Sequence, residues 1–105
     1  MDPLTDGELA AALGALDGWS GDGSGIRRTV EAASFVDGLG IVQAVGLAAE
    51  AANHHPDIDI RWRKLTFALT THDVGGRVSR LDVEMAEAID EIVREHKTLG
   101  AGQGS

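Results

Sequence analysis

Three of the four histidines stand where their side chains can take part in acid–base chemistry. His54 and His55 are adjacent and are followed by Pro56, while His72 comes directly before the turn Asp73-Val74-Gly75-Gly76. Imidazole is the side chain whose unperturbed pKa lies closest to neutrality, so a cluster of histidines can both donate and accept protons in a cell. We therefore treat these three residues as candidate catalytic groups.

An isolated pair of histidines can also have a structural role or bind a metal ion. Two adjacent histidines at a helix end most often cap that end or are solvated. Three histidines would also suffice for a catalytic zinc ion, but adjacent residues point in different directions, unlike the i,i+4 pair of a zinc-protease helix. The zinc site therefore stays a minority alternative. His96, late in a predicted helix, is expected to interact with the negative end of the helix dipole and to be structural.

The residues around the histidines predict where the histidines lie. Proline cannot continue a helix and biases the preceding residue toward extended backbone, so the His54–His55 pair is expected at a helix-to-strand junction. His72 is expected to end the strand 64–71, so all three imidazoles lie at element ends, where loops carry chemistry. Glu50 precedes His54 by one helical turn, and its carboxylate is expected on the same face, close enough to hold His54 cationic. The competing reading of Glu50 is a solvated helix acid.

Three helices are predicted from a repeated start signal. A Ser or Thr is followed three residues later by an acid, a pattern that caps the free N–H groups of a first helical turn, at Thr5–Glu8, Ser34–Asp37 and Ser79–Asp82. Each signal is followed by apolar residues with helical spacing, such as Leu9, Leu13 and Leu16 in the first segment. The second helix, 34–53, is unusually apolar, and its glycines Gly38, Gly40 and Gly46 would allow close approach of another element.

Four strands are predicted between the helices. Segments 18–20 and 25–30 flank a Gly-Asp-Gly-Ser turn and predict a hairpin. Apolar and polar residues alternate over 58–62 and 65–70, as in half-buried antiparallel strands. The order α-β-β-α-β-β-α predicts an α+β fold, a four-stranded antiparallel sheet with three helices packed on one face.

Composition limits the possible classes of protein. A chain of 105 residues fits one domain, predicted over 1–99, followed by a disordered tail, 100–105. The net charge of -8 disfavours nucleic acid and anionic lipid as partners, and the lack of cysteine excludes thiolate sites and disulfides. The acidic N-terminus does not resemble a signal peptide, and no apolar stretch approaches membrane-spanning length. We expect a cytoplasmic protein that does not contact a membrane.

One ordered set of motifs resembles a known family. These motifs are Glu50-Ala51-Ala52-Asn53-His54-His55-Pro56-Asp57-Ile58, Trp62-Arg63-Lys64-Leu65, Leu69-Thr70-Thr71-His72-Asp73, Gly75-Gly76 and Ser79–Asp82. Together they look like the pterin-4a-carbinolamine dehydratases, some of whose animal relatives are dimerisation cofactors of a homeodomain transcription factor. Two positions depart from the family pattern: Trp62 replaces the usual Tyr, and the loop 75–78 is one residue longer, which bears on the placement of Asp82.

The resemblance implies a function and a site. Members of this family are carbon–oxygen lyases (4a-hydroxytetrahydrobiopterin dehydratases) that remove water from 4a-hydroxytetrahydropterin and give quinonoid dihydropterin, with no metal or organic cofactor. It implies that His54, His55 and His72 surround the pterin as catalytic residues. Glu50 and Asp82 would support them, and Thr71 and Trp62 would also contact the substrate, although a core position for Trp62 is favoured.

The family also implies a homodimer or homotetramer formed through helices. A second hypothesis follows from this: a binding or assembly module that keeps the dehydratase fold and acts through its helices without significant catalysis. Because all three histidines are present, the catalytic dehydratase is favoured over the assembly module.

Overall fold

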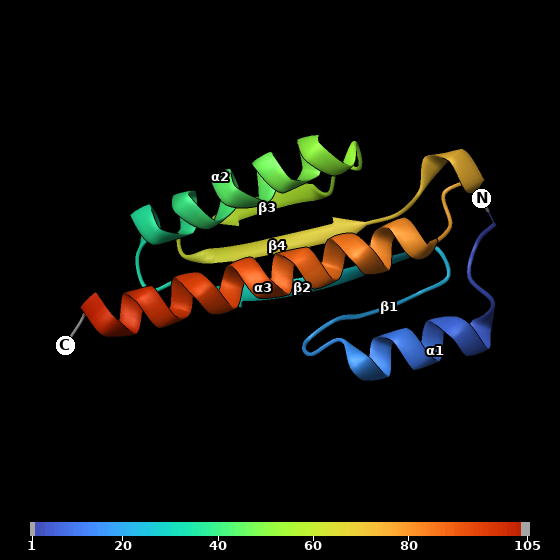
Figure 1. Ribbon diagram of the computed structural model, residues 1–105, viewed down its shortest axis with the longest axis horizontal. Helices are drawn as coiled ribbons and strands as arrows, with labels where there is room; N and C mark the ends of the chain where they lie inside the picture. Colours follow the sequence, from blue (N-terminus) through green and yellow to red (C-terminus); the bar gives the residue numbers. More distant parts are fainter. Residues whose placement is uncertain (1, 104–105) are drawn as a thin grey trace.

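The computed structural model describes the backbone of residues 2–103 and the side chains of residues 2–96. In chain order the elements are α1 (Asp6–Ala15), β1 (Ser20–Asp22), β2 (Gly25–Glu31), α2 (Phe35–Ala52), β3 (Asp57–Arg61), β4 (Lys64–Leu69), a short 3-10 helix η1 (His72–Val74) and α3 (Arg80–Gln103). The predicted order α-β-β-α-β-β-α and the α+β class are confirmed (Figure 1).

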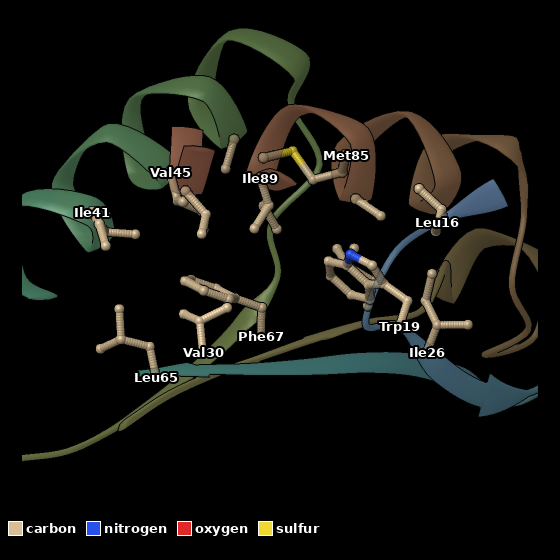
Figure 2. Packing of buried hydrophobic residues seen from close by; sticks show 14 of the residues in the cluster. Leu16, Trp19, Ile26, Val30, Ile41, Val45, Leu65, Phe67, Met85 and Ile89 are labelled. Carbon is tan, nitrogen blue, oxygen red and sulfur yellow. The ribbon is translucent and has the colours of Figure 1, made fainter. Parts of the chain in front are cut away.

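The four strands form one antiparallel sheet in the order β1-β2-β4-β3. Side chains alternate between its faces, and Ile26, Leu65 and Phe67 point into the core. Figure 2 shows Val30 and Phe67 directed from the sheet toward Val45 of α2 and Ile89 of α3. The sheet's other face carries polar and charged residues, as expected for an antiparallel sheet covered on one side.

All three predicted helix starts are confirmed. The Thr5 hydroxyl accepts from the Glu8 N–H and the Glu8 carboxylate accepts from the Thr5 N–H, a reciprocal capping box. The Ser34 hydroxyl accepts from the Asp37 N–H at the start of α2. Ser79 precedes α3, and its N–H donates to the Asp82 carboxylate. Each such cap stabilises the helix by about 1 kcal/mol and fixes the backbone of its first turn.

Helices α2 and α3 lie side by side over the sheet (Figure 1). Leu9 of α1 and Leu16, which follows its last residue, belong to the same buried cluster. A polar contact ties these layers together. The Trp19 indole N–H donates to the buried Asp90 carboxylate over 2.7 Å, and Arg28 of β2 pairs with the same carboxylate. This contact links β2, α3 and the loop after α1, and it lies outside the histidine site.

Some predicted boundaries are wrong. The first strand begins at Ser20 rather than ending there, because Asp22 accepts from the Ser24 N–H and closes a tight turn at Gly23 and Ser24. His72 begins η1 instead of ending a strand. Helix α3 extends to Gln103. The disordered tail at 100–105 stays a prediction, and its residues 104–105 lie outside the described residues.

Helix α2 corrects the expectation that no apolar stretch approaches membrane-spanning length. Its 18 residues have a mean hydropathy of 1.4, which meets a length and composition test for a membrane span. In this fold, however, Ile41, Val45 and Ala49 of α2 are buried in the core. Gly38 also packs closely, since an added Cβ there would lie 3.4 Å from Ala32 Cβ. The opposite side of α2 remains exposed.

Candidate active site

The histidine pair follows the end of α2 through a left-handed residue. Asn53 has φ 51° and ψ 42°, a conformation that asparagine tolerates better than most residues. Its N–H and that of His54 both donate to carbonyls of the last helical turn, with His54 N 3.1 Å from Ala49 O. The chain therefore turns sharply, and the two imidazoles diverge. The His54 side chain is 11% exposed, whereas that of His55 is 54% exposed.

His54 is held by a buried carboxylate from a distant element. Its Nε2 lies 2.6 Å from Oδ1 of Asp82, which is in the first turn of α3 and fully buried. A carboxylate only accepts hydrogen bonds, so Nε2 carries the proton of this contact. The other ring nitrogen, Nδ1, is thereby left to meet a ligand.

The second oxygen of Asp82 is also satisfied. Its Oδ2 accepts from the Thr71 hydroxyl over 2.7 Å and from the Ser79 N–H over 2.8 Å. Thr71 Oγ1 and Ser79 Oγ lie 2.7 Å apart, which closes a small buried network. The first turn of a helix also favours a negative charge at this place. The network fixes the position of Asp82, and therefore the orientation of His54.

The longer loop before α3 does not displace Asp82. Gly75 and Gly76 have φ of 75° and 73°, values that favour glycine. The Gly76 N–H donates to Thr71 O over 3.1 Å, and Thr71 pairs with Arg77 across an isolated bridge. These bonds return the loop to Thr71, whose hydroxyl contacts Asp82 over 2.7 Å.

The three histidines line one cavity of about 220 Å³. The antiparallel pairing of β3 and β4 explains this, because the residues before β3 and the residues after β4 meet at the same end of the hairpin. The other lining residues are Asn53, Thr70, Thr71, Asp73 and Leu81. Of these, only Thr71 is a candidate from sequence. Asn53 and Thr70 adjoin the predicted site, but no motif separates them from ordinary turn residues.

Two sequence predictions about this site are wrong. Glu50 pairs with His55 Nε2 and not with His54, because α2 ends before His54 and the left-handed Asn53 takes that ring away from the face of Glu50. Both partners of the Glu50–His55 pair are exposed, so the contact contributes little to the stability of the fold. Trp62 is neither in the core nor in the cavity. It is 71% exposed, in the turn at the far end of the β3–β4 hairpin.

Among residues 2–96, no group of three or more His, Cys, Asp or Glu side chains is arranged to hold a metal ion. His96 lies away from the cavity, with its Nδ1 3.0 Å from the Ile92 carbonyl oxygen. What the cavity offers chemically is a set of imidazoles in different surroundings. The His54 ring is largely buried against a fixed carboxylate, and the rings of His55 and His72 are exposed to solvent.

Comparisons with known proteins agree with this arrangement. The family described as Pterin 4 alpha carbinolamine dehydratase matches residues 2–92. A protein of Roseiflexus sp. (strain RS-1), provisionally named a pterin-4-alpha-carbinolamine dehydratase, is 50% identical over 90 residues, covering 86% of this chain and 96% of its own. A protein of Mycobacterium avium (strain 104) with the same provisional name is 50% identical over 93 residues, with 89% and 98% covered.

A solved structure is similar as well. The crystal structure of a transcriptional coactivator/pterin dehydratase from Brucella melitensis superposes with a TM-score of 0.80 at 32% identity, covering 85% of this chain and 96% of that one. The family match over residues 2–92 includes every residue that lines the histidine cavity. This chain belongs to the pterin-4a-carbinolamine dehydratase family.

Proposed function

We propose that this protein removes water from a 4a-hydroxytetrahydropterin by histidine acid–base catalysis and so takes part in pterin cofactor recycling. In this reaction the bond from C4a to the hydroxyl oxygen breaks, N5 loses its proton, and a C4a=N5 double bond forms in the quinonoid dihydropterin. The hydroxyl leaves as water once it gains a proton. One proton is therefore given and one taken on each turnover, and the site must supply both a donor and an acceptor.

His54 is the proposed donor. The observation that carries this assignment is its 2.6 Å contact with the buried Asp82, which itself is held by Thr71 and Ser79. With Nε2 committed to Asp82, Nδ1 is the nitrogen that can protonate the leaving hydroxyl. The carboxylate compensates the positive charge of the doubly protonated ring, which is 11% exposed.

His72 or His55 is the proposed acceptor for the N5 proton. Both rings line the same cavity as His54, and both are exposed, so either can exchange a proton with solvent between turnovers. The donor and the acceptor would therefore differ in surroundings as well as in position, which is how two groups of one type perform opposite roles. Thr71 is proposed to act through Asp82.

The test compares histidines inside and outside the cavity. Dehydration of a 4a-hydroxytetrahydropterin is followed by absorbance, with a chelator present, for wild type, His54→Ala, His72→Ala and the control His96→Gln. We expect kcat of His54→Ala to fall by about 10²–10⁴-fold, the usual contribution of a positioned acid. His72→Ala should also lose turnover, and His96→Gln should match wild type.

Three outcomes would contradict parts of this proposal. Wild-type rates equal to the spontaneous reaction would remove the enzyme assignment. A rise in KM for His54→Ala with unchanged kcat would remove the acid role, because uniform binding and not transition-state stabilisation would have been lost. Activity that disappears with chelator would favour the zinc alternative.

A second proposal concerns assembly. Val36, Leu39 and Leu47 are 74%, 42% and 67% exposed, and their spacing of three and eight residues places them on one side of α2. Water-exposed apolar side chains in one stripe mark an association surface. We infer that this stripe pairs with a second copy of the chain in a homodimer or homotetramer. A dehydratase-fold assembly module without catalysis would use the same surface, and the activity assay separates these two functions.

A further inference from the structure

A single peptide group joins the start of the chain to the carboxylate that holds His54. The N–H of this group belongs to Ser79 and donates to Asp82 over 2.8 Å. Its C=O belongs to Val78 and accepts from the Leu4 N–H over 2.9 Å. Figure 1 shows the blue start of the chain beside the connection from η1 to α3, where this contact is made. The segment before α1 is therefore one peptide group away from Asp82.

The preceding peptide group is also bonded on both sides. The C=O of Arg77 accepts from the Thr71 N–H over 3.1 Å, and the N–H of Val78 donates over 2.9 Å to the carbonyl of Gly23, in the turn between β1 and β2. The partners of the two groups come from distant parts of the chain: the segment before α1, the β1–β2 turn, the end of β4 and the first turn of α3. This connection is therefore fixed by tertiary contacts and not by its own sequence.

The second peptide group is buried, and its two bonds depend on each other. Val78 is 2% exposed, and Ser79 and Asp82 are 0% exposed. Because a peptide group is planar, the direction of its C=O fixes the direction of its N–H. A donor to the C=O also polarises the group and strengthens its N–H as a donor. The Leu4 N–H therefore both orients and strengthens the bond from Ser79 to Asp82.

We propose, on the basis of the proposed dehydratase function, that Leu4 is a positioning residue whose backbone N–H keeps Asp82 and His54 in their reactive orientation. The hydrogen bonds form one line, in the order Leu4, the Val78–Ser79 peptide group, Asp82 and His54 Nε2. Leu4 does not line the histidine cavity. Its N–H therefore acts through this line of bonds and not by contact with the substrate.

Two substitutions of Leu4 separate its N–H from its side chain. The side chain is partly buried against the core cluster, so any smaller residue loses packing. Proline at this position also removes the N–H, whereas alanine keeps it. A loss that is specific to Leu4→Pro therefore reports on the hydrogen bond.

The kinetic test compares Leu4→Pro with Leu4→Ala and Thr5→Ala, with each rate expressed per folded protein. Thr5→Ala removes the side-chain cap of α1 but leaves the Leu4 N–H in place, and it is the control for a loosened N-terminal segment. We expect kcat of Leu4→Pro to fall by about three- to tenfold, the equivalent of one hydrogen bond, with KM within about twofold of wild type. Leu4→Ala should recover most of the lost kcat, and Thr5→Ala should match wild type.

NMR of the His54 ring nitrogens gives a readout that a purely structural contact would not move. In wild type Nε2 carries the proton of the neutral ring, because it faces Asp82. In Leu4→Pro we expect part of the population to carry this proton on Nδ1, and in Leu4→Ala and Thr5→Ala we expect the wild-type signals. Unchanged kcat and ring signals in Leu4→Pro, or an equal loss of kcat in Leu4→Ala, would overturn the role of the N–H.

Amide hydrogen exchange tests the line of bonds from its other end and does not require Leu4→Pro to fold. Asp82→Asn leaves a neutral and weaker acceptor for the Ser79 N–H. Because coupling between two sites is reciprocal, the Leu4 amide should then exchange about two- to fivefold faster than in wild type. The Leu9 amide, which donates to the Thr5 carbonyl in α1, is the reference and should not change.

The outcomes separate this inference from the function on which it rests. No change at Leu4, or equal changes at Leu4 and Leu9, would remove the coupling while the dehydratase activity stands. A wild type that does not accelerate dehydration would remove the proposed function, and the catalytic importance of Leu4 with it.

Discussion

The decisive residue of the candidate site is Asp82, because it fixes which nitrogen of His54 faces the cavity. In Asp82→Asn the amide oxygen remains the only acceptor for Thr71 and Ser79, so the amide NH₂ turns toward His54. His54 Nε2 must then accept, and its proton moves to Nδ1 with no charge to compensate a doubly protonated ring. We expect kcat to fall by about 10²–10³-fold with a smaller change in KM, measured by steady-state kinetics with a pH profile.

Glu50→Gln provides the comparison at the same scale. Glu50 contacts the exposed His55, and a solvent-exposed ion pair stabilises a protein by only about 0–1 kcal/mol. Its effect on kcat should therefore be at least tenfold smaller than that of Asp82→Asn. Equal losses in the two variants would mean that Glu50, as the sequence predicts, stands behind the catalytic imidazole.

At the scale of elements, the sequence predicts what depends on neighbours in the chain. Helix starts follow from Thr5, Ser34 and Ser79, because a cap and its acid are three residues apart and need no tertiary contact. The carboxylate behind His54 could not be predicted in this way. Asp82 is 28 residues from His54 in sequence, and the contact depends on how α3 packs beside α2.

Trp62 illustrates the same limit and gives a prediction for the β3–β4 hairpin. It lies in the turn with φ 55°, although bulky residues are strained there, and it stacks against the Arg63 guanidinium at 4.7 Å. Trp62→Asn and Trp62→Ala both remove the ring, but asparagine tolerates this backbone better. We expect the Asn variant to exceed the Ala variant by about 0.5–1 kcal/mol in free energy of unfolding, measured in urea. Equal stabilities would show that the turn carries no strain.

At the scale of the whole molecule, two copies of a chain of net charge -8 repel each other, and burial of apolar surface is one interaction that offsets this repulsion. The stripe Val36, Leu39 and Leu47 is such a surface on α2. It also explains why α2 is apolar enough to meet a membrane-span test while only one of its sides reaches the core. One apolar side of α2 contacts the sheet, and under the proposed assembly the other contacts a second subunit.

This view predicts the effect of charge on the stripe. Val36→Glu combined with Leu47→Glu should lower the mass measured by size-exclusion chromatography with light scattering, because each association would bury unpaired carboxylates on both copies. Ala10→Glu with Ala11→Glu, which adds the same charge at exposed positions of α1, is the control and should keep the wild-type mass. The histidine cavity lies within one chain, so the smaller species should retain dehydratase turnover. A wild type that is already monomeric, or a control that dissociates equally, would contradict the assignment of the stripe.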